Sequence, residues 1–233
     1  MSTGVRNPIY DGLSGQRAEA LEGIISLTIS GELGLEEQTS ENVLVEQLDL
    51  SRTPIREALG ILAFGGIVTQ KPQVGVWVNR FSTDQIKDTL RVSKEVEAMA
   101  LVELAGAQED NSGLLRALSA ASSIVFGPHS YRRDYIADEV LRADAEVHST
   151  FVRDSSLKHF SGVVALAGIK RRIYHIDNPL NRNQGHDVQS SDLDLIAGLT
   201  QTAWQPDGIP TVLSSYYAQQ VDLLEATYTG QKS

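Results

Sequence analysis

The sequence predicts a mainly α-helical protein: an N-terminal winged helix-turn-helix, made of three helices and a β-hairpin, followed by an all-helical bundle. Three observations predict this fold class. Apolar residues recur at helical spacing in three short segments before residue 65. Two β-branched stretches then lie on either side of a turn, between residues 67 and 78. From residue 83 almost to the end the spacing is helical again. We therefore expect two domains, residues 1–80 and residues 81–233.

Each of the three N-terminal helices has its own start or stop signal. The first spans residues 17–31 and ends at a glycine. The second follows Thr39 and Ser40, whose hydroxyls suit a helix N-cap. The third starts from Ser51 as N-cap, tolerates Pro54 in its first turn and ends at two glycines. The apolar-face residues are Leu21, Ile24, Ile25 and Thr28 in the first helix, Val43, Leu44 and Leu48 in the second, and Ile55, Leu59 and Leu62 in the third.

The hairpin is expected to pair residues 67–69 with residues 76–78 across the sequence QKPQVG, which puts a glycine near its tip. The larger domain begins after Arg80. Turn-forming residues divide its helical pattern into segments. The expected helices span residues 83–108, 112–125, 131–154, 156–175, 187–203 and 209–228.

Composition limits where the protein works and what it binds. No apolar run approaches the roughly 18 residues of a membrane span, and the first residues lack the apolar core of a signal peptide. The chain also has no cysteine, so we expect a cytoplasmic location and no membrane partner. The formal net charge of −10 requires that any DNA-binding surface be a local basic patch.

Such a patch is expected at the start of the third helix. Arg52 and Arg56 lie four residues apart and therefore on one face, where each guanidinium could donate two hydrogen bonds to a guanine in the major groove. Ser51 and Thr53 suit phosphate oxygens. Residues 51–80 hold four basic side chains and one acidic one. The alternative is that both arginines are ordinary surface charges, with Arg56 paired to Glu57 or Glu46.

The block SRTPIREAL and the later GIV and GVWV resemble the winged helix-turn-helix of the GntR family of bacterial transcription regulators. The resemblance implies double-stranded DNA as partner, DNA contacts at Arg52, Thr53 and Arg56, and a wing tip at Gly75. Asn42 stands where the family often has an arginine, which implies an altered base preference. One winged helix reads few base pairs, so we expect a homodimeric repressor on a palindromic operator.

The segment STDQIKDTLRVSKEVEAMALVELA resembles the start of the effector domain in the fatty-acid-regulator-like (FadR/FCD) branch of the family. That resemblance implies an all-helical bundle that binds small carboxylates, often through a metal. Asp144 and His148, in RADAEVHSTF, match the Asp-x-x-x-His motif of the branch and lie at a spacing that lets two side chains share an ion. The alternative is a half-buried histidine bonded to its helical neighbour.

Three departures from the branch change the expected site. Relatives supply two more histidines, whose places align here with Asp192 and with Tyr217 or Ala218, and an arginine whose place aligns with Ser93. The ligand set for a divalent metal, Asp144, His148 and Asp192, is therefore incomplete. We expect a cavity lined by these three residues and Tyr217, and a small-molecule effector that is not a plain small carboxylate.

A rival interpretation is a helical metal-dependent hydrolase that uses Asp144 and His148. It would leave the SRTPIREAL block unexplained. The sequence also contains no phosphate-binding glycine loop, no G-x-S-x-G elbow and no cysteine nucleophile. We therefore expect no catalytic residue and no enzyme activity.

Overall fold

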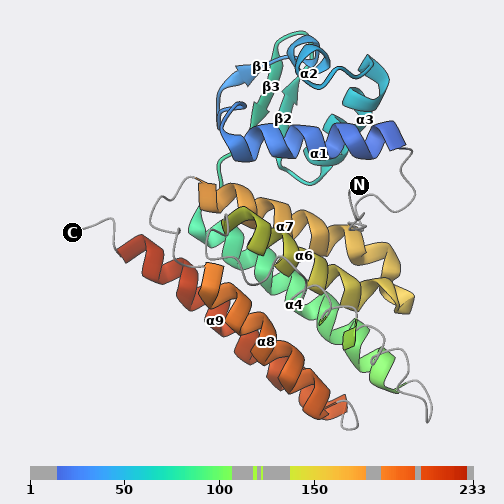
Figure 1. The fold of residues 1–233 in the computed structure, drawn as a ribbon, viewed down its shortest axis with the longest axis vertical. Helices are drawn as coiled ribbons and strands as arrows, with labels where there is room; N and C mark the ends of the chain where they lie inside the picture. Colours follow the sequence, from blue (N-terminus) through green and yellow to red (C-terminus); the bar gives the residue numbers. More distant parts are fainter. Residues whose placement is uncertain are drawn as a thin grey trace. The chain divides into compact units, whose positions relative to one another are not determined.

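The computed structural model describes residues 15–106, 118–119, 122, 137–176, 185–202 and 206–229. These residues divide between Phe81 and Ser82 into two compact units (Figure 1). The N-terminal unit combines three helices with a small antiparallel sheet, and the described elements of the C-terminal unit are all helical. The predicted fold class is confirmed.

The N-terminal helices are α1 (Gly15–Ser30), α2 (Glu41–Leu48) and α3 (Arg52–Phe64). The Ser40 hydroxyl caps α2 by accepting a hydrogen bond from the backbone N–H of Val43 at 3.3 Å. All the inward-facing residues predicted for α1 and α3 are buried. In α2 only Leu44 is fully buried, whereas Val43 is 41% exposed. The apolar face predicted for α2 was therefore too wide.

The sheet has one strand more than the predicted hairpin. Strand β3 (Gly75–Val78) lies between β2 (Val68–Lys71) and β1 (Gln38–Thr39), and both pairings are antiparallel. Strand β1 has two residues, too few to show the alternation of polar and apolar side chains by which a strand is found in sequence. The fold places it just before the cap of α2.

Gly75 is the first residue of β3, and the turn of the wing is formed by residues 72–74. A Cβ atom on Gly75 would lie 2.8 Å from the carbonyl oxygen of Thr39 in β1. A Cβ atom essentially never comes this close to a backbone oxygen, so the pairing of β1 with β3 requires glycine here. The glycine that the sequence placed at the wing tip thus starts the strand after the turn.

Replacing Gly75 by alanine should destabilise the N-terminal unit by about 1–3 kcal/mol, because the methyl group forces β1 away from β3. The measurement is thermal unfolding followed by circular dichroism. Gly60→Ala is the matched control: Gly60 is exposed in α3 with no atom within 4 Å of its Cβ position, so alanine there should stabilise the helix by about 0.5–1 kcal/mol. Equal effects of the two changes would show that the contact with Thr39 is unimportant.

The C-terminal unit is a set of helices that pack side by side (Figure 1). Its described elements are α4 (Thr83–Gly106), α6 (Ala137–Arg153), the 3₁₀ helix η2 (Ser156–Phe160), α7 (Ser161–Ile176), α8 (Gly185–Thr202), the 3₁₀ helix η4 (Pro206–Gly208) and α9 (Ile209–Thr229). Helix α4 packs against α6, α7 and α9, and α8 packs against α6 and α9. No helix within these ranges is long and apolar enough to span a membrane.

Most predicted helices of this unit are present, with one difference. The segment predicted as one helix over residues 156–175 opens with η2, because the Ser155 hydroxyl accepts the N–H of Leu157 and starts a tight turn. The helix predicted over residues 112–125 lies outside the described residues except at 118, 119 and 122, which are helical. The first six residues predicted for the next helix, 131–136, also lie outside them.

Candidate functional site

The predicted DNA-contacting side chains are all exposed at the beginnings of α2 and α3. They are Asn42, Ser51, Arg52, Thr53 and Arg56. Arg56 Nε donates a hydrogen bond to Glu41 Oε2 at 2.7 Å, which shows that the first turn of α2 lies against the opening turns of α3. The ion pair suggested for Arg56 in the sequence, with Glu57 or Glu46, is therefore wrong. Glu57 instead pairs with Arg17 of α1.

The N-terminus of α3 is well suited to an anion. Ser51 occupies the N-cap position but makes no side-chain cap hydrogen bond, and the first turn contains no acidic residue. Backbone N–H groups and the helix dipole therefore face outward without a local carboxylate to neutralise them. On the wing, the Lys71 ammonium lies 5.3 Å from the centre of the Trp77 ring, which holds a second positive charge beside the turn.

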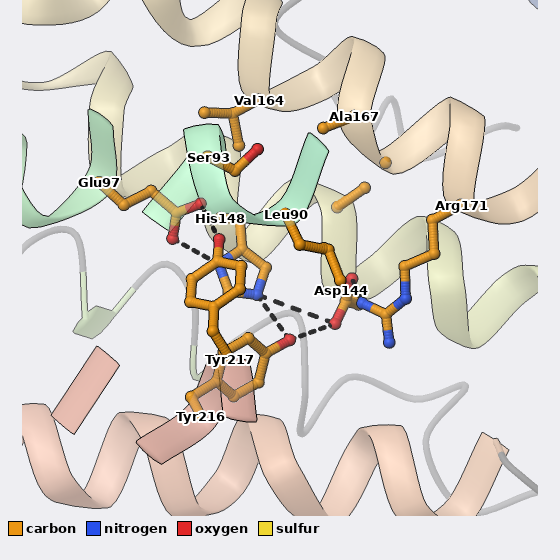
Figure 2. Close-up of a pocket in the computed structure, with 12 residues that line it drawn as sticks. Leu90, Ser93, Glu97, Asp144, His148, Val164, Ala167, Arg171, Tyr216 and Tyr217 are labelled. Atoms are coloured by element: carbon orange, nitrogen blue, oxygen red, sulfur yellow. Dashed lines mark hydrogen bonds and ion pairs between the residues drawn. The ribbon is translucent and has the colours of Figure 1, made fainter. Parts of the chain in front are cut away.

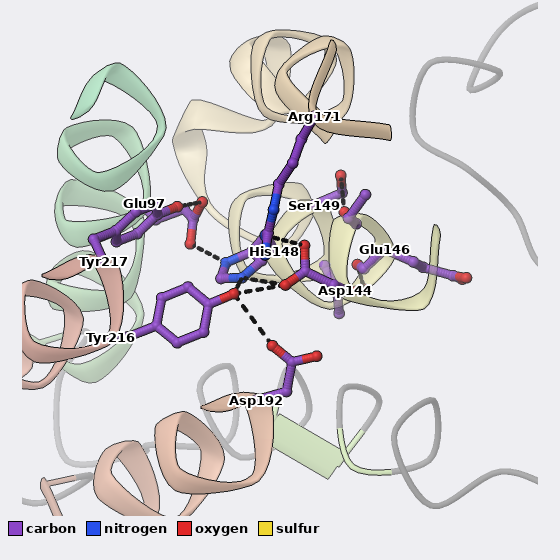
Figure 3. Close-up of polar contacts among 11 residues, drawn as sticks. Glu97, Asp144, Glu146, His148, Ser149, Arg171, Asp192, Tyr216 and Tyr217 are labelled. Atoms are coloured by element: carbon purple, nitrogen blue, oxygen red, sulfur yellow. Dashed lines mark hydrogen bonds and ion pairs between the residues drawn. The ribbon is translucent and has the colours of Figure 1, made fainter. Parts of the chain in front are cut away.

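A second cluster of polar side chains is buried within the helices of the C-terminal unit. The predicted Asp144 and His148 lie on α6, and Asp192 on α8 comes close to both (Figure 3). One ligand atom from each of these residues lies within 4.8 Å of the others. This arrangement of two carboxylates and an imidazole could hold a metal ion.

His148 lies between two partners (Figure 2). Its Nδ1 is 2.6 Å from Glu97 Oε2, and its Nε2 is 2.8 Å from the Tyr216 hydroxyl. Burial alone would lower the pKa of His148, but the carboxylates of Glu97, Asp144 and Asp192 raise it to about 9. The imidazole is therefore protonated at neutral pH. The alternative, a half-buried histidine bonded to its helical neighbour, differs from the structure, because His148 is buried and its short contacts are to Glu97 and Tyr216 on other helices, while Asp144 of its own helix is 3.8 Å away.

Tyr216 of α9 is the residue that joins the cluster. Its hydroxyl donates a hydrogen bond to Asp144 Oδ1 at 2.6 Å and lies 3.2 Å from Asp192 Oδ1 (Figure 3). The sequence alignment had placed Tyr217 or Ala218 at this position. Tyr217 instead donates to Glu97 Oε1 at 2.6 Å, still facing the pocket, and Ala218 is exposed.

Arg171 of α7 brings a guanidinium into the cluster. Its Nη1 donates to Asp144 Oδ2 at 2.9 Å, and its Nη2 donates to Gln220 Oε1. Burial would raise the pKa of Asp144, but the charges of Arg171 and His148 outweigh it and lower that pKa. The pKa of Asp192 is raised by burial and by the charge of Asp144. Asp144 is thus the ionised member of the carboxylate pair.

The cavity at this site is small. It measures about 20 Å³, and a single water needs about 10–15 Å³ on the same measure, so there is room for roughly one water molecule. Of the four residues expected to line it, Asp144, His148 and Tyr217 do so and Asp192 does not. Ser93 also lines the cavity, and its Oγ has no hydrogen-bond partner among the described residues. Arg171 Nε, also at the cavity, likewise lacks one there. An effector would have to displace side chains to enter.

Sequence reasoning missed three members of this cluster. Glu97 had a detectable signal, since it falls on the same stripe of α4 as the buried Leu90, Ser93 and Ala100. Arg171 lies in the basic run Lys170–Arg172 of α7, and such a run is usually read as solvent-exposed, so its burial could not be predicted from the sequence. For Tyr216, the sequence predicted the adjacent Tyr217 or Ala218 in its place.

The free energy of unfolding should fall as the pH rises from about 6.5 to 9, because His148 keeps its proton in the folded protein and loses it in the unfolded chain over this range. The raised pKa of Asp192 acts with the same sign. Urea unfolding by circular dichroism across this range provides the measurement. Glu97→Gln removes one charge that raises the pKa, so it should reduce the alkaline loss; an unchanged slope would contradict the assignment.

The match to a known sequence family lies within the N-terminal unit. Residues 17–78 match the family described as bacterial regulatory proteins, gntR family. A stretch of 62 residues is 37% identical to an uncharacterized HTH-type transcriptional regulator in an unstable DNA locus of Streptomyces ambofaciens. This match covers 27% of the chain and only 26% of that relative, about a quarter of each.

Solved structures resemble the whole chain. Escherichia coli McbR/YncC superposes with a TM-score of 0.71 at 16% identity, covering 93% of this chain and all of the other. Lar, which controls the expression of the Listeria monocytogenes agr system, gives a TM-score of 0.58 at 15% identity, covering 92% of this chain and 98% of the other. At these identities the likeness concerns the fold alone.

Proposed function

Since residues 17–78 are a helix-turn-helix domain of the GntR family of bacterial regulatory proteins, we propose that this chain is a DNA-binding transcription regulator. In this proposal residues 1–80 bind an operator, and residues 81–233 bind an effector and form a homodimer. The observation that supports this proposal is the start of α3. Its first two turns carry the exposed Arg52 and Arg56, and its first turn contains no acidic residue. The protein acts as a repressor.

The dimer follows from how much sequence one domain can read. A single recognition helix contacts few base pairs, whereas two copies related by a two-fold axis double the number and require a palindromic site. Glu41 supports a division of roles between the arginines. It holds Arg56 by its Nε, while Arg52 has no such ion pair among the described residues and is free to meet a base edge.

The effector pocket is assigned to the cluster of Asp144, His148, Asp192 and Tyr217. These residues are buried within the C-terminal unit, and two other polar atoms at the same cavity, Ser93 Oγ and Arg171 Nε, lack hydrogen-bond partners among the described residues. Both can donate a hydrogen bond, so the effector should carry acceptor oxygens. It must also displace the tyrosines that fill the site, because the cavity accommodates only about one water.

The test is binding to DNA selected from a random duplex library by the purified protein, followed by a gel-shift and light scattering of the complex. We expect an enriched palindrome and two chains per duplex. One chain per site, or equal affinity for the selected and scrambled duplexes, would contradict the proposal. A thermal-shift screen of small molecules then identifies effectors, which should raise Tm and also alter operator affinity.

A further inference from the structure

We infer that the effector pocket works without a metal ion, because the Tyr216 hydroxyl takes the position of the ion and Arg171 supplies its positive charge. The inference takes from the proposed function only the statement that this pocket binds an effector. It concerns the chemistry of the pocket and is tested separately from DNA binding. The residues that suggest a metal are present, but the group they surround is a phenol.

The position of the Tyr216 oxygen is the first line of support. An ion shared by Asp144, His148 and Asp192 would lie about 2.0–2.2 Å from one atom of each. The Tyr216 oxygen already lies among the same atoms, at 2.6 Å from Asp144 Oδ1, 2.8 Å from His148 Nε2 and 3.2 Å from Asp192 Oδ1. These are hydrogen-bond distances, so an ion and the neutral phenol cannot occupy this space together.

The charges are the second line of support. A divalent ion would offset the buried carboxylates, and here Arg171 does so from α7 by donating to Asp144 Oδ2. That bond uses the oxygen opposite the one bound by Tyr216, so both oxygens of Asp144 have partners. Asp144 therefore needs no ion to satisfy its charge or its lone pairs.

Glu97 explains why the site still looks like a metal site. A histidine that binds a metal typically donates its other ring N–H to a carboxylate, which fixes the direction of the ring. Glu97 holds His148 in this way, with Nε2 directed at the centre of the cluster. Glu97 and His148 thus have the arrangement typical of a metal site, but the group at its centre is a hydroxyl.

The experiment begins with elemental analysis of the full-length protein purified without added metal or chelator. We expect far less than one metal ion per chain, and a Tm that neither EDTA nor added ZnCl₂ or MnCl₂ changes. Tyr216→His should then replace the phenol with a ligand and gain one Zn²⁺ per chain, with a Tm rise of about 5 °C or more at saturating metal. Tyr217→His is the matched control and should gain none, because its side chain faces Glu97.

Two results would overturn the inference. One is stoichiometric metal in the unaltered protein whose removal by EDTA lowers Tm. The other is a Tyr216→His protein with a native circular dichroism spectrum that takes up no more Zn²⁺ than Tyr217→His. If Tyr216→His does not fold, the metal content of the unaltered protein still decides the question. Operator binding measured on the same unaltered sample shows whether the proposed function stands in either case.

Discussion

Replacing Arg171 by methionine should lower the free energy of unfolding of the C-terminal unit by about 3–5 kcal/mol. The change removes the guanidinium that donates to Asp144 Oδ2 at 2.9 Å and leaves a buried carboxylate without its cation. A charge in this position cannot be rehydrated unless the helices separate, and it can otherwise be removed only by protonating the carboxyl group; either outcome lowers the stability of the folded state. Urea unfolding followed by helical circular dichroism measures it.

A double-mutant cycle separates the ion pair from the loss of packing. Asp144→Asn removes the charge that Arg171 neutralises, so the variant with both changes should recover a large part of the stability lost in Arg171→Met alone. Arg91→Met is the control for replacing an arginine in this unit. Its guanidinium is 80% exposed and lies 3.5 Å from an equally exposed Asp88, so the effect should be near zero. Additive losses in the cycle would show that Arg171 and Asp144 are not coupled.

Replacing Arg52 by alanine should weaken binding to the selected operator by about 5- to 150-fold, the equivalent of the 1–3 kcal/mol expected for one bidentate contact to a guanine. Arg56→Ala should cost a similar amount or less, because Glu41 already occupies one of its donors. Both side chains are exposed, so Tm should hardly change. Fluorescence anisotropy with a labelled duplex provides the measurement.

The control for this series removes the same charge from the other unit. Arg91→Ala also removes one positive charge, but Arg91 belongs to α4 of the C-terminal unit. This variant should leave operator affinity nearly unchanged. Binding to scrambled DNA should fall much less than binding to the operator in Arg52→Ala. An equal loss on both duplexes would mean that Arg52 contacts only the phosphate backbone.

Features that depend on neighbours along the chain could be predicted from the sequence. The cap at Ser40, the proline-started α3 and the spacing of Arg52 and Arg56 are all local, and helical periodicity correctly identified the buried faces of α1 and α3. The sequence also predicted that Asp144 and His148 lie side by side, because residues four apart project from the same face of a helix.

Which side chains contact one another across helices depends on how the helices pack, and this became known only from the structure. Glu97, Arg171 and Tyr216 reach the Asp144–His148 pair from three other helices, and no periodicity in one helix records what lies opposite it. Tyr216 and Tyr217 show the physical reason most directly. Successive residues on a helix point about 100° apart, so the rotation of α9 in its packing decides which phenol meets Asp144 and which meets Glu97.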